Sequence, residues 1–176
     1  MRKITALLWV ALLLSPLFLA SCRNTKQQAI DYNNKIVDLQ SKIVKGMLDF
    51  SSTFDSKDTA LMEKKYGELL AVIDTSIKET RAMEPFDGTS EFRDAAINLF
   101  TFYQDITKKE YKEIVEIFKK SQIQQADVDR IDKLNQDISK REKVLDDQFM
   151  VVQEGFAKKY GIPLVDNELQ KQIDNM

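Results

Sequence analysis

Apolar residues recur along most of this chain at steps of three and four positions, the spacing that collects them on one side of an α-helix. The longest run has steps of 3, 3, 4, 7, 4, 3, 4 and 4 and consists of Val128, Ile131, Leu134, Ile138, Leu145, Phe149, Val152, Phe156 and Tyr160. Three earlier runs have the same character, whereas the alternation of a half-buried strand is hard to find. The pattern predicts four helices, at about 27–53, 58–84, 89–121 and 125–160.

Short polar segments separate these runs and supply the residues that end one helix and start the next. Pro85 disfavours helix at the residue before it, and the pair Asp87-Gly88 is typical of a turn. Gly161, followed by Pro163, predicts the end of the last helix. Such short connections place consecutive helices antiparallel, so we expect an all-α fold, an up-down four-helix bundle. The apolar spacing after Pro163 predicts a short C-terminal helical tail.

The beginning of the chain has a different pattern. Basic residues at positions 2 and 3 precede an apolar run over 4–20, which is typical of a secretory signal peptide and marginal as a membrane-spanning helix. Cys22, directly behind this run, is the single cysteine of the sequence. The end of the run resembles the lipobox of bacterial lipoproteins in Leu19, Ala20, Ser21 and Cys22.

The lipobox resemblance implies a covalent membrane anchor. The Cys22 sulfur would carry a diacylglycerol in thioether linkage, the chain would be cut before Cys22, and the new amino group would receive an acyl chain. Each buried CH₂ contributes about 0.8 kcal/mol, so two or three chains hold a protein stably on a membrane. We therefore expect a signal peptide at 1–21, a short polar tether at 22–28 and a single helical-bundle domain at 29–176.

Two apolar stripes are interrupted by charged residues. The stripe of the third predicted helix skips at Glu110, and that of the fourth skips at Arg141. Antiparallel pairing of the two helices brings these interruptions to similar height. One interpretation is a Glu110–Arg141 pair inside the bundle, which would set the register of the helices more than it would add stability. The other is that both side chains lean out to solvent as the stripes drift.

The turn between the third and fourth predicted helices is the other candidate site. With the N-terminus at the membrane, up-down topology places this turn at the far end of the bundle. It presents one apolar residue among polar ones, in the order Ser121, Gln122, Ile123 and Gln124. The turn is either a contact site for a partner or a solvated connection in which one exposed apolar residue needs no explanation.

Composition narrows the possible functions. The chain has 26 Lys and Arg against 28 Asp and Glu, and without Arg2 and Lys3 the balance is 24 against 28, a formal charge of −4. That balance argues against binding to nucleic acid. The sequence has no histidine and no second thiol, which removes Ser-His and Cys-His catalysis and histidine zinc sites. We expect no enzymatic activity, no catalytic residue, no metal and no cofactor besides the lipid on Cys22.

The lipobox, the stretch "EPFDGTSEFRDAAINLFTFY" and the stretch "EGFAKKYGIPL" together resemble an uncharacterised family of all-helical surface lipoproteins of bacteria. The resemblance implies a helical fold and a cell-envelope location, and it brings no activity with it. Arg23 follows Cys22, so the aspartate that retains some lipoproteins at the inner membrane is absent. We expect the outer membrane and leave the leaflet open.

Two functions are compatible with these observations. The first is a non-enzymatic surface or structural protein, anchored by its lipid, that acts through contact with an unidentified envelope or extracellular protein. The alternative is a lipoprotein that binds a small ligand between its helices. An apolar cavity with polar groups at its mouth would favour the alternative, and a solidly packed bundle would favour contact through the surface.

Overall fold

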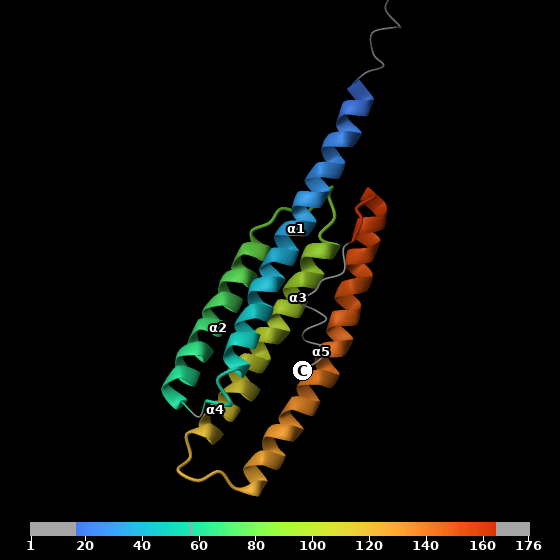
Figure 1. Cartoon of the computed structure of the whole chain (residues 1–176). Helices are drawn as coiled ribbons and strands as arrows, with labels where there is room; N and C mark the ends of the chain where they lie inside the picture. Colours follow the sequence, from blue (N-terminus) through green and yellow to red (C-terminus); the bar gives the residue numbers. More distant parts are fainter. Residues whose placement is uncertain (1–16, 57, 165–176) are drawn as a thin grey trace, which may run out of the picture.

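The computed structural model describes residues 17–56 and 58–164, with side chains from Thr25 onward, and its long elements are all helices (Figure 1). In chain order these are α1 (Leu17–Ser51), α2 (Thr59–Arg81), α3 (Glu91–Ile106), the π-helix η1 (Thr107–Tyr111), α4 (Lys112–Phe118) and α5 (Gln125–Tyr160). Because α3, η1 and α4 follow one another without a break, the chain forms four rods. The all-α bundle predicted from the apolar spacing is confirmed. The C-terminal tail and most of the expected signal peptide lie outside the described residues.

Three of the four expected helices begin and end within three residues of the positions read from the sequence. The exception is α1, which begins at Leu17, ten residues before the expected start at 27. The segment 22–28, expected to be a polar tether, is therefore the helical lead of α1. No helix within the described residues is both long enough and apolar enough to cross a bilayer.

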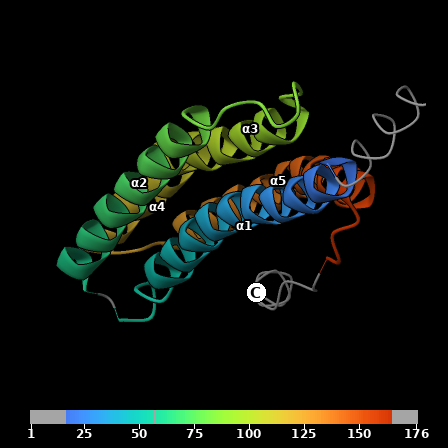
Figure 2. The same cartoon turned by 90° about the horizontal axis from the view of Figure 1, so that it is seen from above.

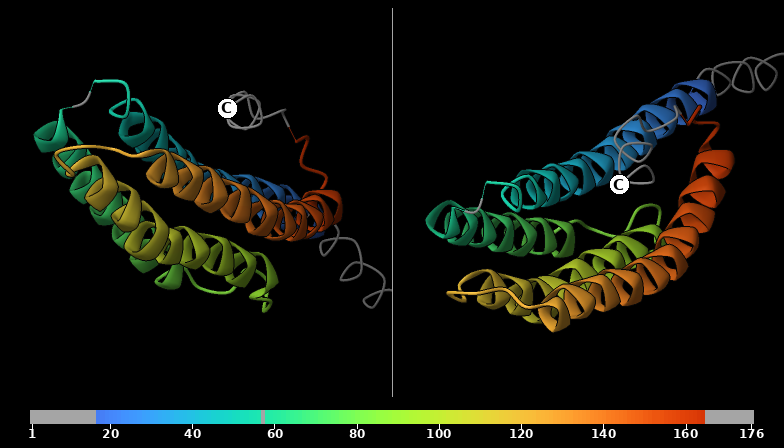
Figure 3. Two further views of the ribbon diagram at one scale, coloured as in Figure 1. Left: turned by 90° about the horizontal axis from the view of Figure 1, so that it is seen from below. Right: turned by 60° about the horizontal axis from the view of Figure 1, so that its bottom comes forward.

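The four rods pack as an up-down bundle. Helix α2 packs against α1 and α3, α3 packs against α5, and α1 and α5 share fewer contacts. Seen from above, α2 and α3 lie along one side of the bundle and α1 and α5 along the other (Figure 2). Helix α5 curves along its length (Figure 3), as long helices commonly do around a core.

Local chemistry explains where the helices begin and end. The Asp58 side chain caps α2 by accepting a hydrogen bond of 3.0 Å from the Leu61 N–H. A capping box begins α5, in which Gln124 and Asp127 satisfy each other's backbone N–H groups. Gly161, with φ 63°, ends α5 in the left-handed conformation that favours glycine.

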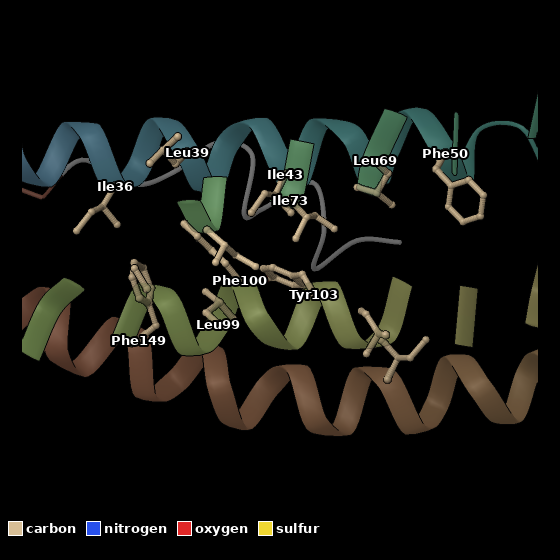
Figure 4. Close-up of a cluster of buried hydrophobic side chains, with 14 of the residues drawn as sticks. Ile36, Leu39, Ile43, Phe50, Leu69, Ile73, Leu99, Phe100, Tyr103 and Phe149 are labelled. Atoms are coloured by element: carbon tan, nitrogen blue, oxygen red, sulfur yellow. The ribbon is translucent and has the colours of Figure 1, made fainter. Parts of the chain in front are cut away.

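Large apolar side chains from all four rods fill the centre (Figure 4). The largest fully buried ones are Tyr103, Phe50, Phe100, Phe149, Ile36, Leu39, Ile43, Met62, Leu69, Ile73, Leu99 and Ile106. Aromatic rings close both ends of this core. The ring centroids of Phe92 and Phe156 are 4.9 Å apart at one end, and those of the stacked rings Phe54 and Phe118 are 5.4 Å apart at the other. Full burial of one such side chain contributes about 1.5–3 kcal/mol, so the core accounts for the fold without a disulfide.

Candidate functional site

The proposed lipid-attachment residue belongs to the lead of α1. Cys22 lies within the bounds of this helix, but its side chain and those of Leu19, Ala20 and Ser21 lie outside the described residues. Among the side chains of α1 that the structure describes, from Thr25 onward, the first buried one is Ala29, seven residues after Cys22. Seven residues of α-helix span about 10 Å, so Cys22 stands about two turns beyond the start of the core. Lipidation stays a prediction.

The π-helix η1 explains why the third apolar stripe skips a step. Ile106 and Ile114 are both fully buried although eight residues separate them. Two α-helical turns take about 7.2 residues, so an eight-residue step would rotate Ile114 off the core. The wider turn of η1 absorbs the excess, and the Thr107 hydroxyl donates a 2.7 Å hydrogen bond to the Tyr103 carbonyl beside it. The skipped step marks this place in the sequence, although a regular helix with a drifting stripe would give the same spacing.

Glu110, in η1, meets Arg141 of α5. The Arg141 guanidinium donates a hydrogen bond of 2.6 Å to Glu110 Oε1, and it also lies 5.4 Å from the centre of the Phe102 ring. The Glu110 side chain is 16% exposed and that of Arg141 is 48% exposed. The pair therefore lies at the edge of the bundle instead of in its interior, because the guanidinium stays partly in water while the carboxylate turns inward. The second oxygen, Glu110 Oε2, is buried and has no hydrogen-bond partner among the described residues.

Two tyrosines lie next to this pair and keep their protons. Burial raises the pKa of Tyr103 well above its ordinary value, and the charges of Glu142 and Asp146 on α5 raise it further. The pKa of Tyr111 is raised too, first by burial and then by Glu142 and Glu110. These phenols are neutral hydrogen-bonding groups at physiological pH. Together with Glu110 and Arg141 they form a cluster that we call the polar seam. This cluster is better suited to aligning η1 with α5 than to proton transfer.

The turn after α4 lies at the end of the bundle opposite the N-terminus of α1 (Figure 1). All four of its candidate residues, Ser121 to Gln124, are exposed, and Ile123 is 44% exposed. A second apolar side chain, Val128, is 41% exposed close by in the first turn of α5. Its exposure departs from the predicted stripe, which includes Val128 among the core-facing residues of α5.

Two open grooves lie between helices on opposite sides of the bundle. One, of about 220 Å³, runs between α1 and α2 past Lys42, Gly46 and Leu69. The other, of about 280 Å³, runs between α3 and α5 past Asn98 and Gln148. Within the part of the chain that the structure describes, no three Cys, Asp or Glu side chains gather in a geometry for a metal ion. Neither groove contains a nucleophile paired with a base.

The outer face of α5 carries residues that the sequence pattern did not single out. Val144 and Val151 are the most exposed large apolar side chains among the described residues, at 55% and 69%. Gly155 follows one turn after Val151, and a Cβ built there would meet no atom within 4 Å. The signal was present, since β-branched residues and glycine are unfavourable choices for an exposed helix interior.

Comparison with known proteins adds no relative. No family model, no curated protein and no solved structure matches this chain.

Proposed function

We propose that this protein is a non-enzymatic lipoprotein of the cell envelope, anchored through Cys22, that acts by contact between its helical surface and another protein. The observation that carries the proposal is the apolar surface on α5, where Val144 and Val151 stay exposed while the core is complete without them. Exposed apolar surface that folding does not use is typical of an interaction site. The outer membrane is the location that we propose.

The small-ligand alternative receives less support. Pockets for small molecules usually enclose about 300–1,000 Å³, whereas the two described grooves hold about 220 and 280 Å³ and are open to solvent. Side chains such as Tyr103 and Phe100 fill the space between the rods where a ligand would have to lie. The packing therefore favours contact through the surface.

The first turns of α1, before the helix enters the core, would connect the lipid anchor to the bundle rigidly. The helix from Leu17 to Ser51 passes Cys22 and enters the bundle without a break. A lipid on Cys22 would thus be joined to the core by helix, and the distal turn around Ile123 would be held away from the membrane. A continuous helix transmits orientation, which a flexible linker does not.

Two measurements test the proposal. Cells fed labelled palmitate should label the wild-type protein and leave Cys22→Ala unlabelled; label that persists in the variant refutes the anchor. A short lysine-reactive crosslinker applied to isolated envelopes should shift the protein into a complex of larger mass that contains a second polypeptide. A protein that remains wholly uncrosslinked refutes contact as its mode of action.

A further inference from the structure

Two exposed apolar residues of α5, Val144 and Val151, lie together with Gln148 and Gly155 on one narrow face, which we call the α5 stripe. Steps of 4, 3 and 4 residues separate them, so they lie along one line of the helix surface. The stripe spans about 17 Å at 1.5 Å per residue. It ends in charge on both sides, at Arg141 before it and at Lys158 after it. This length corresponds to about three turns of a second helix.

Folding gives no reason for this choice of residues. Val144 and Val151 do not belong to the core, and β-branched residues cost helix stability. Gly155 costs up to about 1 kcal/mol relative to alanine in a helix interior, and open space at its Cβ position would admit any side chain. A glycine beside two valines leaves room for another helix to approach closely. The stripe therefore has the character of a helix-packing surface without its partner.

A groove continues the stripe toward α3. Gln148 belongs to both, and the floor of the groove adds the apolar side chains of Ala95, Leu145 and Val152. Its volume of about 280 Å³ is suited to a row of side chains projecting from a docked helix. The stripe and the groove together form one continuous, largely apolar surface between α3 and α5.

The long edges of this surface carry carboxylates, whereas its two ends carry the cations Arg141 and Lys158. Glu91 and Asp94 lie along the α3 edge of the groove, and Asp147 and Glu154 flank the stripe on the other side. Asp94 and Asp147 already bind Arg93 and Lys143. Glu91 and Glu154 have no ion-pair partner among the described residues, and each could receive a cation from outside.

We propose that the α5 stripe and its groove bind an amphipathic helix of another protein whose apolar ridge is flanked by Lys or Arg. Apolar side chains of the ridge would cover Val144 and Val151, and the flanking cations would pair with Glu91 and Glu154. A second copy of this chain suits the surface poorly, because two acidic edges would then face each other. This inference rests on the proposed function and names the surface and the partner that the function uses.

Photo-crosslinking in intact cells tests the proposal on the full chain. A benzophenone amino acid replaces Gln148, and a matched control carries the same probe at Val128, which lies on α5 outside the stripe. The probe at 148 should crosslink to a segment of another protein whose sequence predicts an amphipathic helix, with an apolar ridge flanked by Lys or Arg. The probe at 128 should give at least about tenfold less of that product, because it lies away from the bound helix.

Variants separate the apolar and the charged contributions. The double changes Val144→Gln with Val151→Gln, and Glu91→Lys with Glu154→Lys, should each lower the crosslink at 148 about tenfold, or about 1.4 kcal/mol. Val128→Gln should leave the yield unchanged. Thermal unfolding of the glutamine variant should match or exceed that of the wild type, which excludes misfolding as the cause of the loss.

Each other outcome overturns the inference. A crosslink to this chain's own sequence identifies a second copy if the product has the mass of a dimer and a contact within the chain if it has the mass of a monomer, and a crosslink to lipid places the stripe against the membrane. A partner segment without basic residues, or a yield that Glu91→Lys with Glu154→Lys leaves unchanged, refutes the charge argument. Lysine crosslinks elsewhere on the bundle with none from position 148 would refute the α5 stripe and leave the proposed function standing.

Discussion

Helices α1 and α5 are nearly equal in length, at 35 and 36 residues, yet the protein uses them differently. Helix α1 buries eight of its described side chains, namely Ala29, Asn33, Ile36, Leu39, Gln40, Ile43, Val44 and Phe50. Helix α5 buries five, namely Leu134, Ile138, Phe149, Phe156 and Ala157. Four large apolar side chains of α5 are exposed instead, namely Val128, Val144, Met150 and Val151.

The difference follows from what surrounds each helix. Helix α1 packs closely on α2 and also touches α3 and α5, so much of its circumference is covered. Helix α5 packs mainly on α3 and leaves a wide outer face in water. Helix α1 therefore serves the core, whereas α5 turns one face to the core and exposes further apolar residues on the other. Those residues are the ones that a partner can use.

The sharpest test of this comparison is truncation of one side chain in each helix. Ile36→Ala in α1 removes a fully buried side chain and should lower the free energy of unfolding by about 2–5 kcal/mol. Val151→Ala in α5 should change it by less than about 0.5 kcal/mol, because Val151 lies in water. Urea unfolding followed by circular dichroism measures both. A loss above about 1 kcal/mol for Val151→Ala would show that the outer face of α5 contributes to folding.

Alkaline pH should lower the free energy of unfolding through two tyrosines, Tyr103 of α3 and Tyr111 of η1, that lie near the carboxylates of α5. Tyr103 and Tyr111 have pKa values raised above the ordinary 10.0, by burial and then by nearby carboxylates that include Glu142 of α5. The native state keeps these protons after the unfolded chain has lost them. Unfolding therefore becomes more favourable as pH rises above about 10, by up to about 1.4 kcal/mol per pH unit for each tyrosine.

Phenylalanine variants isolate that effect from the titration of lysines. Tyr103→Phe and Tyr111→Phe should each flatten the decline in the free energy of unfolding between about pH 10 and 11.5. Tyr160→Phe serves as the control, since this half-exposed ring at the end of α5 lies away from the cluster. Equal slopes for all three variants would contradict the assignment of buried, protonated phenols to Tyr103 and Tyr111.

A glycine in each helix offers a matched pair of smaller effect. A Cβ at Gly46 of α1 would lie 3.1 Å from the Leu69 Cδ1, whereas one at Gly155 of α5 would meet nothing within 4 Å. Gly155→Ala should raise the free energy of unfolding by about 0.5–1 kcal/mol through helix propensity alone. Gly46→Ala should gain less, since Leu69 must shift. If the two variants gain equally in thermal unfolding, the contrast between a packed and an open helix is wrong.

Apolar periodicity predicted the four helical rods because each rod buries one face, and the residues of that face recur every three or four positions in the sequence. It also pointed to Glu110 and Arg141, since a break in the stripe marks the place where a side chain leaves the core. Periodicity could not show that η1 is a π-helix, because the eight-residue step from Ile106 to Ile114 also suits a drifting stripe. It also placed Val128 in the apolar stripe, whereas this side chain is 41% exposed. Apolar periodicity did not identify the α5 stripe, because residues outside the apolar face of a helix are normally assigned to solvent.

The contact between Glu110 and Arg141 gives the smallest expected effect and bears on how α5 is held in register. A second ion pair joins the same two rods, since Arg130 donates to Glu113 at 2.6 and 2.8 Å. The two pairs differ in burial, because the Glu110 side chain is 16% exposed and that of Glu113 is 41% exposed. Double-mutant cycles with alanine should give couplings of about 0.2–1 kcal/mol for each pair.

Salt separates the two pairs. At 1 M salt the screening length falls to about 3 Å, which weakens interactions between charges that water surrounds. The Glu113–Arg130 coupling should nearly vanish, whereas the Glu110–Arg141 coupling should keep more than half of its value because the protein shields the carboxylate and the Phe102 ring covers the guanidinium. Equal losses of coupling energy for the two pairs would mean that Glu110 is as exposed to solvent as Glu113. In that case the polar seam would not hold α5 in register, and the inner apolar side chains of α5 would have to fix its position unaided.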